Sequence, residues 1–140
     1  MRLARTLLLL FSGLLAPAFS HAELVLVASV RNPAMELSHE RAENLYLGST
    51  TTLADGTPVK LMDLPNGASR DDFYLKLTGK NPAQIRAYWS RLVFTGRALP
   101  PREANSIAEA RQWLIDTPNL VGYMERTDVP PGARILLRLP

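Results

Sequence analysis

The sequence predicts one α/β domain with three layers, in which helices cover both faces of a mixed or mostly parallel sheet. Four short apolar stretches have the length of buried strands, and four stretches with helical spacing of apolar residues are interleaved with them. A chain of 140 residues, of which 46% are apolar, has the size of one domain rather than two. Strands that alternate with helices favour a sheet in the middle layer.

The first 22 residues have the pattern of a secretory signal peptide. Two arginines precede an apolar run over residues 7–15, and Ser20-His21-Ala22 is a typical cleavage site with small residues at both ends. The apolar run is shorter than the roughly 20 residues of a membrane-spanning helix. We therefore expect residues 1–22 to be removed after export to the periplasm, leaving one domain over residues 23–140.

The first part of this domain predicts a strand, a helix and a second strand. Residues 23–30 are apolar and rich in β-branched side chains, as in a parallel strand that is covered on both faces. Ser38 is suited to cap a helix that ends at Gly48. After the turn at Asp55-Gly56, residues 59–62 form a second short apolar stretch. Strand and helix thus alternate from the start of the domain.

Two helices are expected in the middle of the chain. Ser69, followed by Asp72, resembles a capping box and predicts a helix over residues 70–77. The segment Asn81-Pro82-Ala83-Gln84 combines an asparagine cap, a proline at the first helical position and a glutamine at the third. Apolar residues then recur with helical spacing over residues 85–92, so this helix is expected to pack against the core.

The last part of the chain predicts a loop, a helix and two strands. Consecutive prolines at positions 100 and 101 prevent regular hydrogen bonding in the loop. Ser106 and Glu109 have the spacing of another capping box. Residues 119–124 and 135–139 are expected to be strands, and Gly122 marks a point of close approach within the first of them.

The composition excludes several kinds of catalytic or metal site. The chain has no cysteine, which removes disulfides, thiolate metal sites and cysteine nucleophiles. Without the leader, His39 is the only histidine, and its neighbours Ser38 and Glu40 suit a helix start better than a catalytic triad. Asp71 and Asp72 are adjacent on a helix and point in different directions, so they do not form a carboxylate pair. We expect no enzyme activity, no metal and no cofactor.

The charge balance argues against a nucleic-acid partner. The whole chain has 16 basic and 13 acidic side chains, and the two arginines of the leader, Arg2 and Arg5, leave 14 basic side chains in the mature domain. We interpret these 14 basic side chains as scattered among the acidic ones along the chain and not gathered in a basic stripe. Arg97 and Arg102 in the loop before the last helix are available to an acidic partner, although surface arginines are usually only solvated.

The candidate binding site is the helix start at Ser69. Free backbone N–H groups and the helix dipole make such a start a natural site for an anion, which Ser69 and the following amides would hold. Asp71 and Asp72 oppose an anion there, and Arg70 compensates in part. Two interpretations stay open at this point, a structural cap and a contact with an anion or other ligand.

Eight short segments follow one another in a characteristic order: Asn44-Leu45-Tyr46-Leu47-Gly48, Asp55-Gly56, residues 59–65, Phe73-Tyr74, Tyr88-Trp89, Phe94-Thr95-Gly96, Pro100-Pro101 and Val121-Gly122-Tyr123. The ordered set resembles the phosphate ABC transporter substrate-binding protein family, within the type 2 periplasmic-binding superfamily. The resemblance extends over about residues 24–123 and is closest to short, single-lobe members.

The resemblance implies a single lobe of a type 2 periplasmic-binding fold and a role in solute binding. In phosphate binders of this family a Gly-Ser-Gly-Thr turn, preceded by an arginine, holds the phosphate. The matching stretch here is Ala68-Ser69-Arg70-Asp71, which retains the serine alone. Ser69 and Arg70 are thus the candidate ligand residues for weak binding of phosphate or another small anion, with the cleft completed by a second copy or another protein. The alternative is a non-catalytic interaction module that docks on a membrane transporter or sensor protein.

Overall fold

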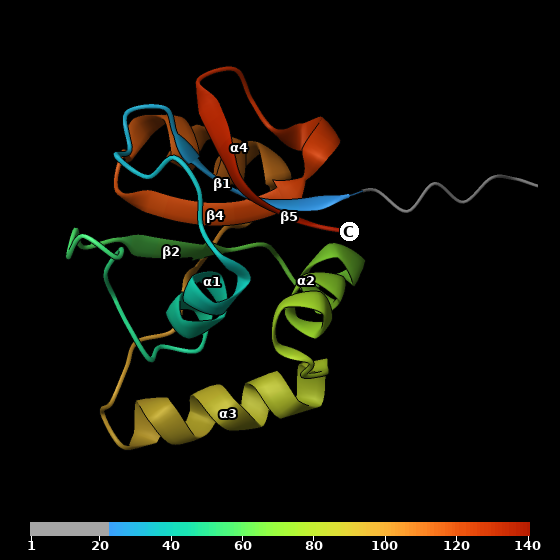
Figure 1. The fold of residues 1–140 in the computed structure, drawn as a ribbon. Coiled ribbons are helices and arrows are strands. Elements are labelled where there is room, and N and C mark those ends of the chain that lie inside the picture. Colours follow the sequence, from blue (N-terminus) through green and yellow to red (C-terminus); the bar gives the residue numbers. More distant parts are fainter. Residues whose placement is uncertain (1–22) are drawn as a thin grey trace, which may run out of the picture.

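The computed structural model describes residues 23–140, so the predicted leader lies outside the described residues. In this part of the chain, five strands form one sheet in the order β3-β2-β4-β1-β5 (Figure 1). The elements in chain order are β1 (Leu24–Ser29), α1 (His39–Tyr46), β2 (Lys60–Asp63), α2 (Ala68–Thr78), α3 (Pro82–Phe94), β3 (Arg102–Glu103), α4 (Ile107–Asp116), β4 (Leu120–Glu125), a 3₁₀ turn (Arg126–Asp128) and β5 (Ala133–Leu139).

The sheet is mixed, which is one of the two arrangements that the sequence predicted. Strand β2 runs parallel to β3 and β4, whereas β1 runs antiparallel to both of its neighbours, β4 and β5. All six residues of β1 are buried, which confirms the expectation of a strand covered on both faces. The parallel pairing suggested for β1 is wrong, because burial on both faces depends on the helices above and below a strand and not on the direction of its neighbours.

Consecutive side chains of β4 show the three layers. The ring of Tyr123 stacks on Phe73 of α2, with centroids 3.5 Å apart and planes 1° from parallel. The preceding residue, Gly122, faces Met62 of β2 and Leu114 of α4. A side chain at this glycine would overlap the end of the Met62 side chain. Helices α1 and α2 therefore lie on one face of the sheet and α4 on the other, and α3 lies beneath α1 and α2 (Figure 1). The predicted close approach at Gly122 is confirmed.

The helix starts follow the predicted caps in three of four cases. Ser38 caps α1, and Asn81 and Gln84 form the complete capping box of α3, with both hydrogen bonds at 2.9 Å. In α4 the Ser106 hydroxyl accepts from the amide of Glu109 at 3.0 Å. The Glu109 carboxylate accepts from the amide of the residue before Ser106, so this cap is only half of a capping box.

One strand was not predicted. Strand β3 consists of two exposed residues, Arg102 and Glu103, which pair with the carboxyl end of β2 directly after the prolines. It has no apolar signal because neither side chain enters the core. Among residues 23–140, no helix is long and apolar enough to cross a membrane.

Candidate functional site

The candidate site lies where β2 ends and α2 begins. Met62 and Asp63 at the end of the strand are buried, and Pro65-Asn66-Gly67 leads the chain into the helix. The helix begins at Ala68, so its cap is Gly67, which has no side chain to accept a hydrogen bond from the first turn. The capping box predicted for Ser69 and Asp72 is therefore wrong.

The first turn of α2 has amide donors without a partner. The amide of Asp71 donates to the carbonyl of Gly67 at 3.1 Å, which closes the first helical bond. No acceptor within residues 23–140 binds the amides of Ser69 and Arg70. Gly67 and Ala68 are exposed, so these donors lie at the surface, where the helix dipole favours negative charge.

The structure brings Ser69 and Arg70 together at this site, but both side chains already have partners. The Ser69 hydroxyl donates to the Glu125 carboxylate at 3.0 Å. The Arg70 guanidinium lies 3.4 Å from Asp63 and 3.1 Å from Glu103, and it also donates to the carbonyl of Leu64 at 3.3 Å. Arg70 therefore anchors the start of α2 to β2 and β3.

Asp63 is the buried centre of this arrangement and was not identified from the sequence. The hydroxyl of Tyr74 donates to its Oδ2 at 2.7 Å, and the hydroxyl of Tyr123 donates to its Oδ1. The Tyr123 oxygen also accepts from the amide of Leu64 at 3.2 Å. A polar residue directly after a buried strand is the signal that would have indicated Asp63, because strand ends in α/β sheets often carry functional groups.

Burial controls the titration of this cluster. Desolvation raises the pKa of Asp63, and the increase is opposed by the hydrogen bond from Tyr123, the charge of Arg70 and the hydrogen bond from Tyr74. Desolvation and the charge of Asp63 also raise the pKa of Tyr74 and Tyr123 far above the ordinary value. Both tyrosines therefore remain protonated and act as donors to the carboxylate.

The charges around the start of α2 are mostly negative. Arg70 is in contact with Asp63 and Glu103, Ser69 is in contact with Glu125, and Asp71 lies in the first turn of the helix. An anion at the free amides would meet this negative field, which weakens the binding of fully ionised ligands. An oxyanion that still carries a proton has less charge and could donate a hydrogen bond to a carboxylate.

A cavity of about 630 Å³ adjoins this cluster. Its wall includes Asp63, Arg70 and Glu103 from the site, with Arg86 and Trp89 from α3. The cavity is open on one side, so a ligand placed in it would stay in contact with water. A closed ligand pocket would need cover from a second surface.

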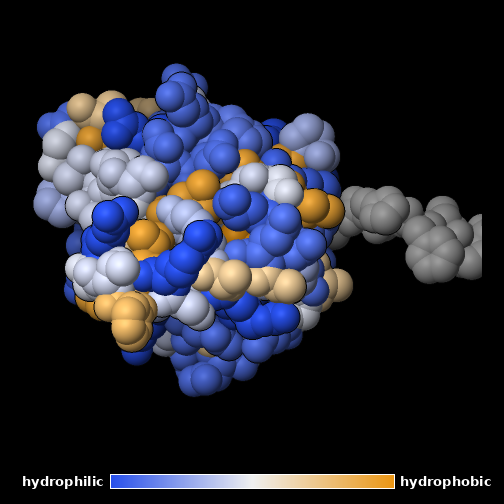
Figure 2. Space-filling model, turned by 90° about the horizontal axis from the view of Figure 1, so that it is seen from below, coloured by the Kyte–Doolittle hydropathy of each residue, from blue (hydrophilic) through white to orange (hydrophobic). Residues whose placement is uncertain are grey.

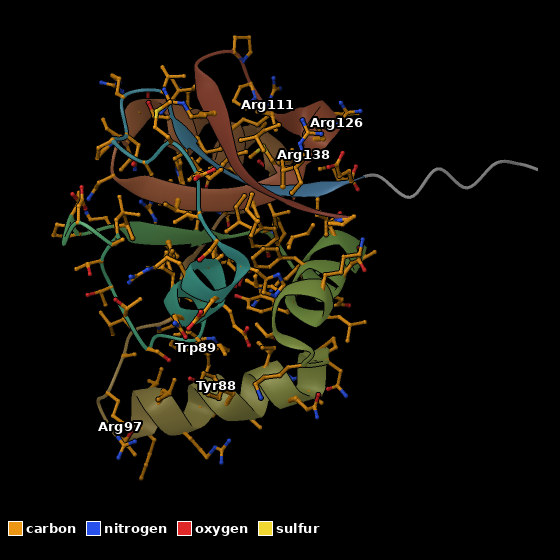
Figure 3. The ribbon with its side chains drawn as sticks, viewed as in Figure 1. Tyr88, Trp89, Arg97, Arg111, Arg126 and Arg138 are labelled. Atoms are coloured by element: carbon orange, nitrogen blue, oxygen red, sulfur yellow. The ribbon has the colours of Figure 1, made fainter. Side chains whose placement is uncertain are left out.

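The aromatic side chains of Tyr88, Trp89 and Trp113 make mainly structural contacts. Tyr88 and Trp89 point from α3 toward α1 (Figure 3), and the Tyr88 hydroxyl donates to the carbonyl of Leu47 at 2.5 Å. Trp89 is buried against Gly48. Trp113 is half-buried, and the Arg102 guanidinium stacks over its ring at 3.9 Å. For Tyr88 and Trp89 these contacts agree with the prediction that the helix over residues 85–92 packs against the core.

His39 is exposed in the first turn of α1, as predicted. A ring nitrogen lies 2.8 Å from the carbonyl of Leu77, which links the start of α1 to the end of α2. In the part of the chain that the structure describes, no three histidine, cysteine or acidic side chains are grouped as metal ligands.

The comparisons with known proteins find the fold but no close sequence relative. No family model and no curated protein sequence matches this chain. A substrate-binding protein of the phosphate ABC transporter class from Clostridium perfringens, solved with bound phosphate, superposes with a TM-score of 0.64 at 14% identity. That superposition covers 82% of this chain and 44% of the other. The chain thus has the fold of about half of a phosphate-binding receptor.

Two further solved structures agree with this result. An ABC-type phosphate transport receptor from Vibrio cholerae matches with a TM-score of 0.53 at 14% identity, covering 82% of this chain and 45% of that one. A protein from Planctomyces limnophilus DSM 3776, described as a possible phosphate-binding protein, matches with a TM-score of 0.58 at 9% identity, and the match covers 82% of this chain and 40% of that one. The resemblance seen in the sequence is confirmed as a likeness of fold, and this chain spans less than half the length of each neighbour.

Proposed function

We propose that this chain is an exported, non-enzymatic solute-binding protein of the phosphate-transporter type, reduced to one lobe. The observation that carries the proposal is the uncapped start of α2, where the amides of Ser69 and Arg70 have no partner among the described residues. This start adjoins the carboxyl end of β2, in a fold shared with a receptor solved with bound phosphate. Ligands of open α/β sheets bind at such strand ends.

The surrounding groups favour phosphate over a fully ionised anion. The amides of Ser69 and Arg70 offer donors, while the Glu125 carboxylate, 3.0 Å from the Ser69 hydroxyl, offers an acceptor. Phosphate keeps at least one proton at neutral pH, so it can accept from the amides and donate to a carboxylate. Sulfate has no proton to donate and meets the full repulsion of the nearby acids. We expect the site to prefer phosphate to sulfate.

The affinity is expected to be weak in the monomer. Arg70 is already shared between Asp63 and Glu103, so its charge is only partly available to a ligand. The start of α2 is exposed, and a single lobe leaves one side of the anion in water. A second copy or another protein would have to cover the site to give tight binding.

Calorimetric titration of phosphate and of sulfate into phosphate-stripped protein tests this proposal. We expect saturable heat with phosphate, little or none with sulfate, and roughly tenfold weaker phosphate binding in Ser69→Ala, because the Glu125 carboxylate then loses the hydroxyl that holds it beside the amides. Ser49→Ala, at an exposed position after α1 and outside the cavity, is the matched control and should bind like the unmodified protein. Equal binding of phosphate by both serine variants would contradict the assignment of the site.

The alternative is a non-catalytic module that has lost ligand binding and docks on a membrane transporter or sensor. The observation in its favour is that the Ser69 hydroxyl and the Arg70 guanidinium are both engaged within the chain. Absence of heat and of any thermal shift at millimolar phosphate would support this alternative and remove the phosphate-binding proposal.

Export has a separate test. The intact mass of the protein, purified from the periplasmic fraction after expression of the full chain in a Gram-negative host, should correspond to a chain that begins at Glu23. Retention of residues 1–22, or recovery from the cytoplasm, would contradict cleavage after Ala22.

A further inference from the structure

Basic charge is concentrated in one segment of the fold. Residues 79–102, which contain α3 and the loop after it, hold five basic side chains and no acidic one. The interpretation of the charges as scattered among acids along the whole mature chain is therefore wrong for this segment. The five side chains are Lys80, Arg86, Arg91, Arg97 and Arg102.

Three of these arginines have no partner among the described residues. Lys80 lies 5.7 Å from the Tyr88 ring, and Arg102 stacks on Trp113. The other three are all exposed, and none of them forms an ion pair or a side-chain hydrogen bond within residues 23–140: Arg86, Arg91 and Arg97. Figure 3 shows Arg97 pointing away from the fold beyond the end of α3.

Large apolar side chains project beside these arginines. Phe94, at the last position of α3, is 92% exposed, and Leu99 in the following loop is 87% exposed. Val93 is half-exposed. In the view from below, orange apolar side chains stand singly among blue hydrophilic ones (Figure 2). We call the combined surface the α3 patch; its residues are Arg86, Arg91, Val93, Phe94, Arg97 and Leu99.

We infer that the α3 patch docks on an anionic lipid surface. Exposed arginines attract a negatively charged membrane, and apolar side chains between them enter the boundary between headgroups and acyl chains. The mature chain has 14 basic and 13 acidic side chains, so this attraction comes from the local concentration of charge and not from the net charge. The inference does not rest on the phosphate site, although Arg86, Val93 and Phe94 also line the cavity that adjoins it.

The form of the patch favours lipid over a protein partner. Phe94 and Leu99 are almost fully exposed, so most of each side chain projects into solvent, although Phe94 also lies at the edge of the cavity beside Arg86, and Leu99 at the edge of a second hollow beside Arg97. A bilayer accepts such projections without a complementary pocket. Residues 79–102 contain no acid, and the two acids that share a cavity wall with Arg86 and Phe94, Asp63 and Glu103, are in contact with Arg70. The unpaired charge of the patch is therefore positive and matches a negatively charged surface, whereas protein interfaces usually present both signs.

Vesicle co-sedimentation tests the inference with protein purified after expression of the full chain. The probes are vesicles of equal parts phosphatidylcholine and phosphatidylglycerol, and vesicles of phosphatidylcholine alone. We expect binding to the anionic vesicles only, weakened at about 0.5 M sodium chloride because salt screens the charges. Arg91→Gln with Arg97→Gln should lower the affinity roughly thirtyfold, and Phe94→Ser with Leu99→Ser roughly tenfold or more.

Matched double variants at other exposed sites separate the patch from general effects. Arg111→Gln with Arg138→Gln removes the same number of positive charges from another part of the molecule (Figure 3), where Arg138 lies 3.5 Å from Glu23. Met35→Ser with Leu75→Ser removes two other exposed apolar side chains. All variants share the same N-terminus, so residues 1–22 cannot explain a difference between them. Circular dichroism and thermal unfolding verify that each variant is folded.

Four results would overturn the inference. The first two are the absence of binding to anionic vesicles and equal binding to neutral vesicles. The third is an equal loss of binding in the patch variants and the control variants. The fourth is self-association in sedimentation that depends on Phe94 and Leu99, without any binding to lipid. The last result would assign the patch to a second copy of this chain.

Discussion

The start of α2 and the α3 patch use arginine in opposite ways. Arg70 at the start of α2 contacts two carboxylates and a carbonyl, around an almost completely buried Asp63. Arg91 and Arg97 in the patch are exposed and have no partner among the described residues. Charges that are paired over a buried group fix the fold, while unpaired charges on an exposed surface are available for binding. The two regions should therefore respond differently to substitution.

The largest effect on stability is expected at Tyr123. Tyr123→Phe removes the donor to Asp63 and the acceptor for the amide of Leu64, and leaves a buried carboxylate with one donor fewer. The free energy of unfolding should fall by about 3 kcal/mol, measured by urea denaturation. Tyr88→Phe is the control, since it loses one hydrogen bond at a half-buried position and should cost about 1 kcal/mol. Equal losses would contradict the central role of Asp63.

Arginine substitutions compare the two regions directly. Arg70→Gln leaves Asp63 buried without its cationic partner and should lower the free energy of unfolding by about 2 kcal/mol. Arg91→Gln should change it by less than about 0.5 kcal/mol, because an exposed, unpaired arginine stabilises little. Denaturation curves that rank the two variants in the opposite order would show that the Arg70 ion pairs do not hold the start of α2.

The raised pKa of Asp63 predicts a pH dependence of stability. The folded protein binds the proton of this carboxyl more tightly than the unfolded chain, whose pKa is near 3.8. The contribution of Asp63 to stability therefore decreases as the pH rises from about 3.8 through the raised pKa. Relative to Asp63→Asn, which cannot ionise, the unmodified protein should lose stability over this range in urea denaturation. A relative gain would mean that the pKa is lowered.

The smallest effect on stability is expected at Gly67, with a large effect on binding. Gly67→Asp supplies the missing cap to the amides of α2 and should raise the free energy of unfolding by a few tenths of a kcal/mol. The same carboxylate would occupy the amides and exclude phosphate. Gly67→Ala has no capping oxygen, and its methyl group meets open space, with the Pro65 carbonyl oxygen nearest at 3.9 Å. Phosphate heats that are the same in both variants would exclude the amides as the binding groups.

The sequence predicted most elements because their signals are local. The complete cap of α3 at Asn81 and Gln84 involves neighbouring residues, and both bonds form as expected. The buried β1 and the close approach at Gly122 were also visible in the pattern of residue types. The direction of β1 and the short β3 were not predictable from local signals, because strand pairing depends on residues far apart in the chain.

The site was predicted only in part for the same reason. Ser69 has the local pattern of a cap, but its hydroxyl donates to Glu125, 56 residues away, and the cap position is Gly67, which has no capping side chain. Arg70 was expected to offset Asp71 and Asp72, yet it contacts Asp63 and Glu103. Contacts between distant elements decide which groups remain free for a ligand.

The most direct test of the proposed function is the calorimetric titration of phosphate into the phosphate-stripped protein, carried out with Gly67→Asp in parallel and with sedimentation to determine the oligomeric state. We predict saturable binding of phosphate, weak in the monomer, little heat from sulfate, and no binding in Gly67→Asp. No heat and no thermal shift with phosphate up to millimolar concentration would contradict the solute-binding role and favour the non-catalytic interaction module.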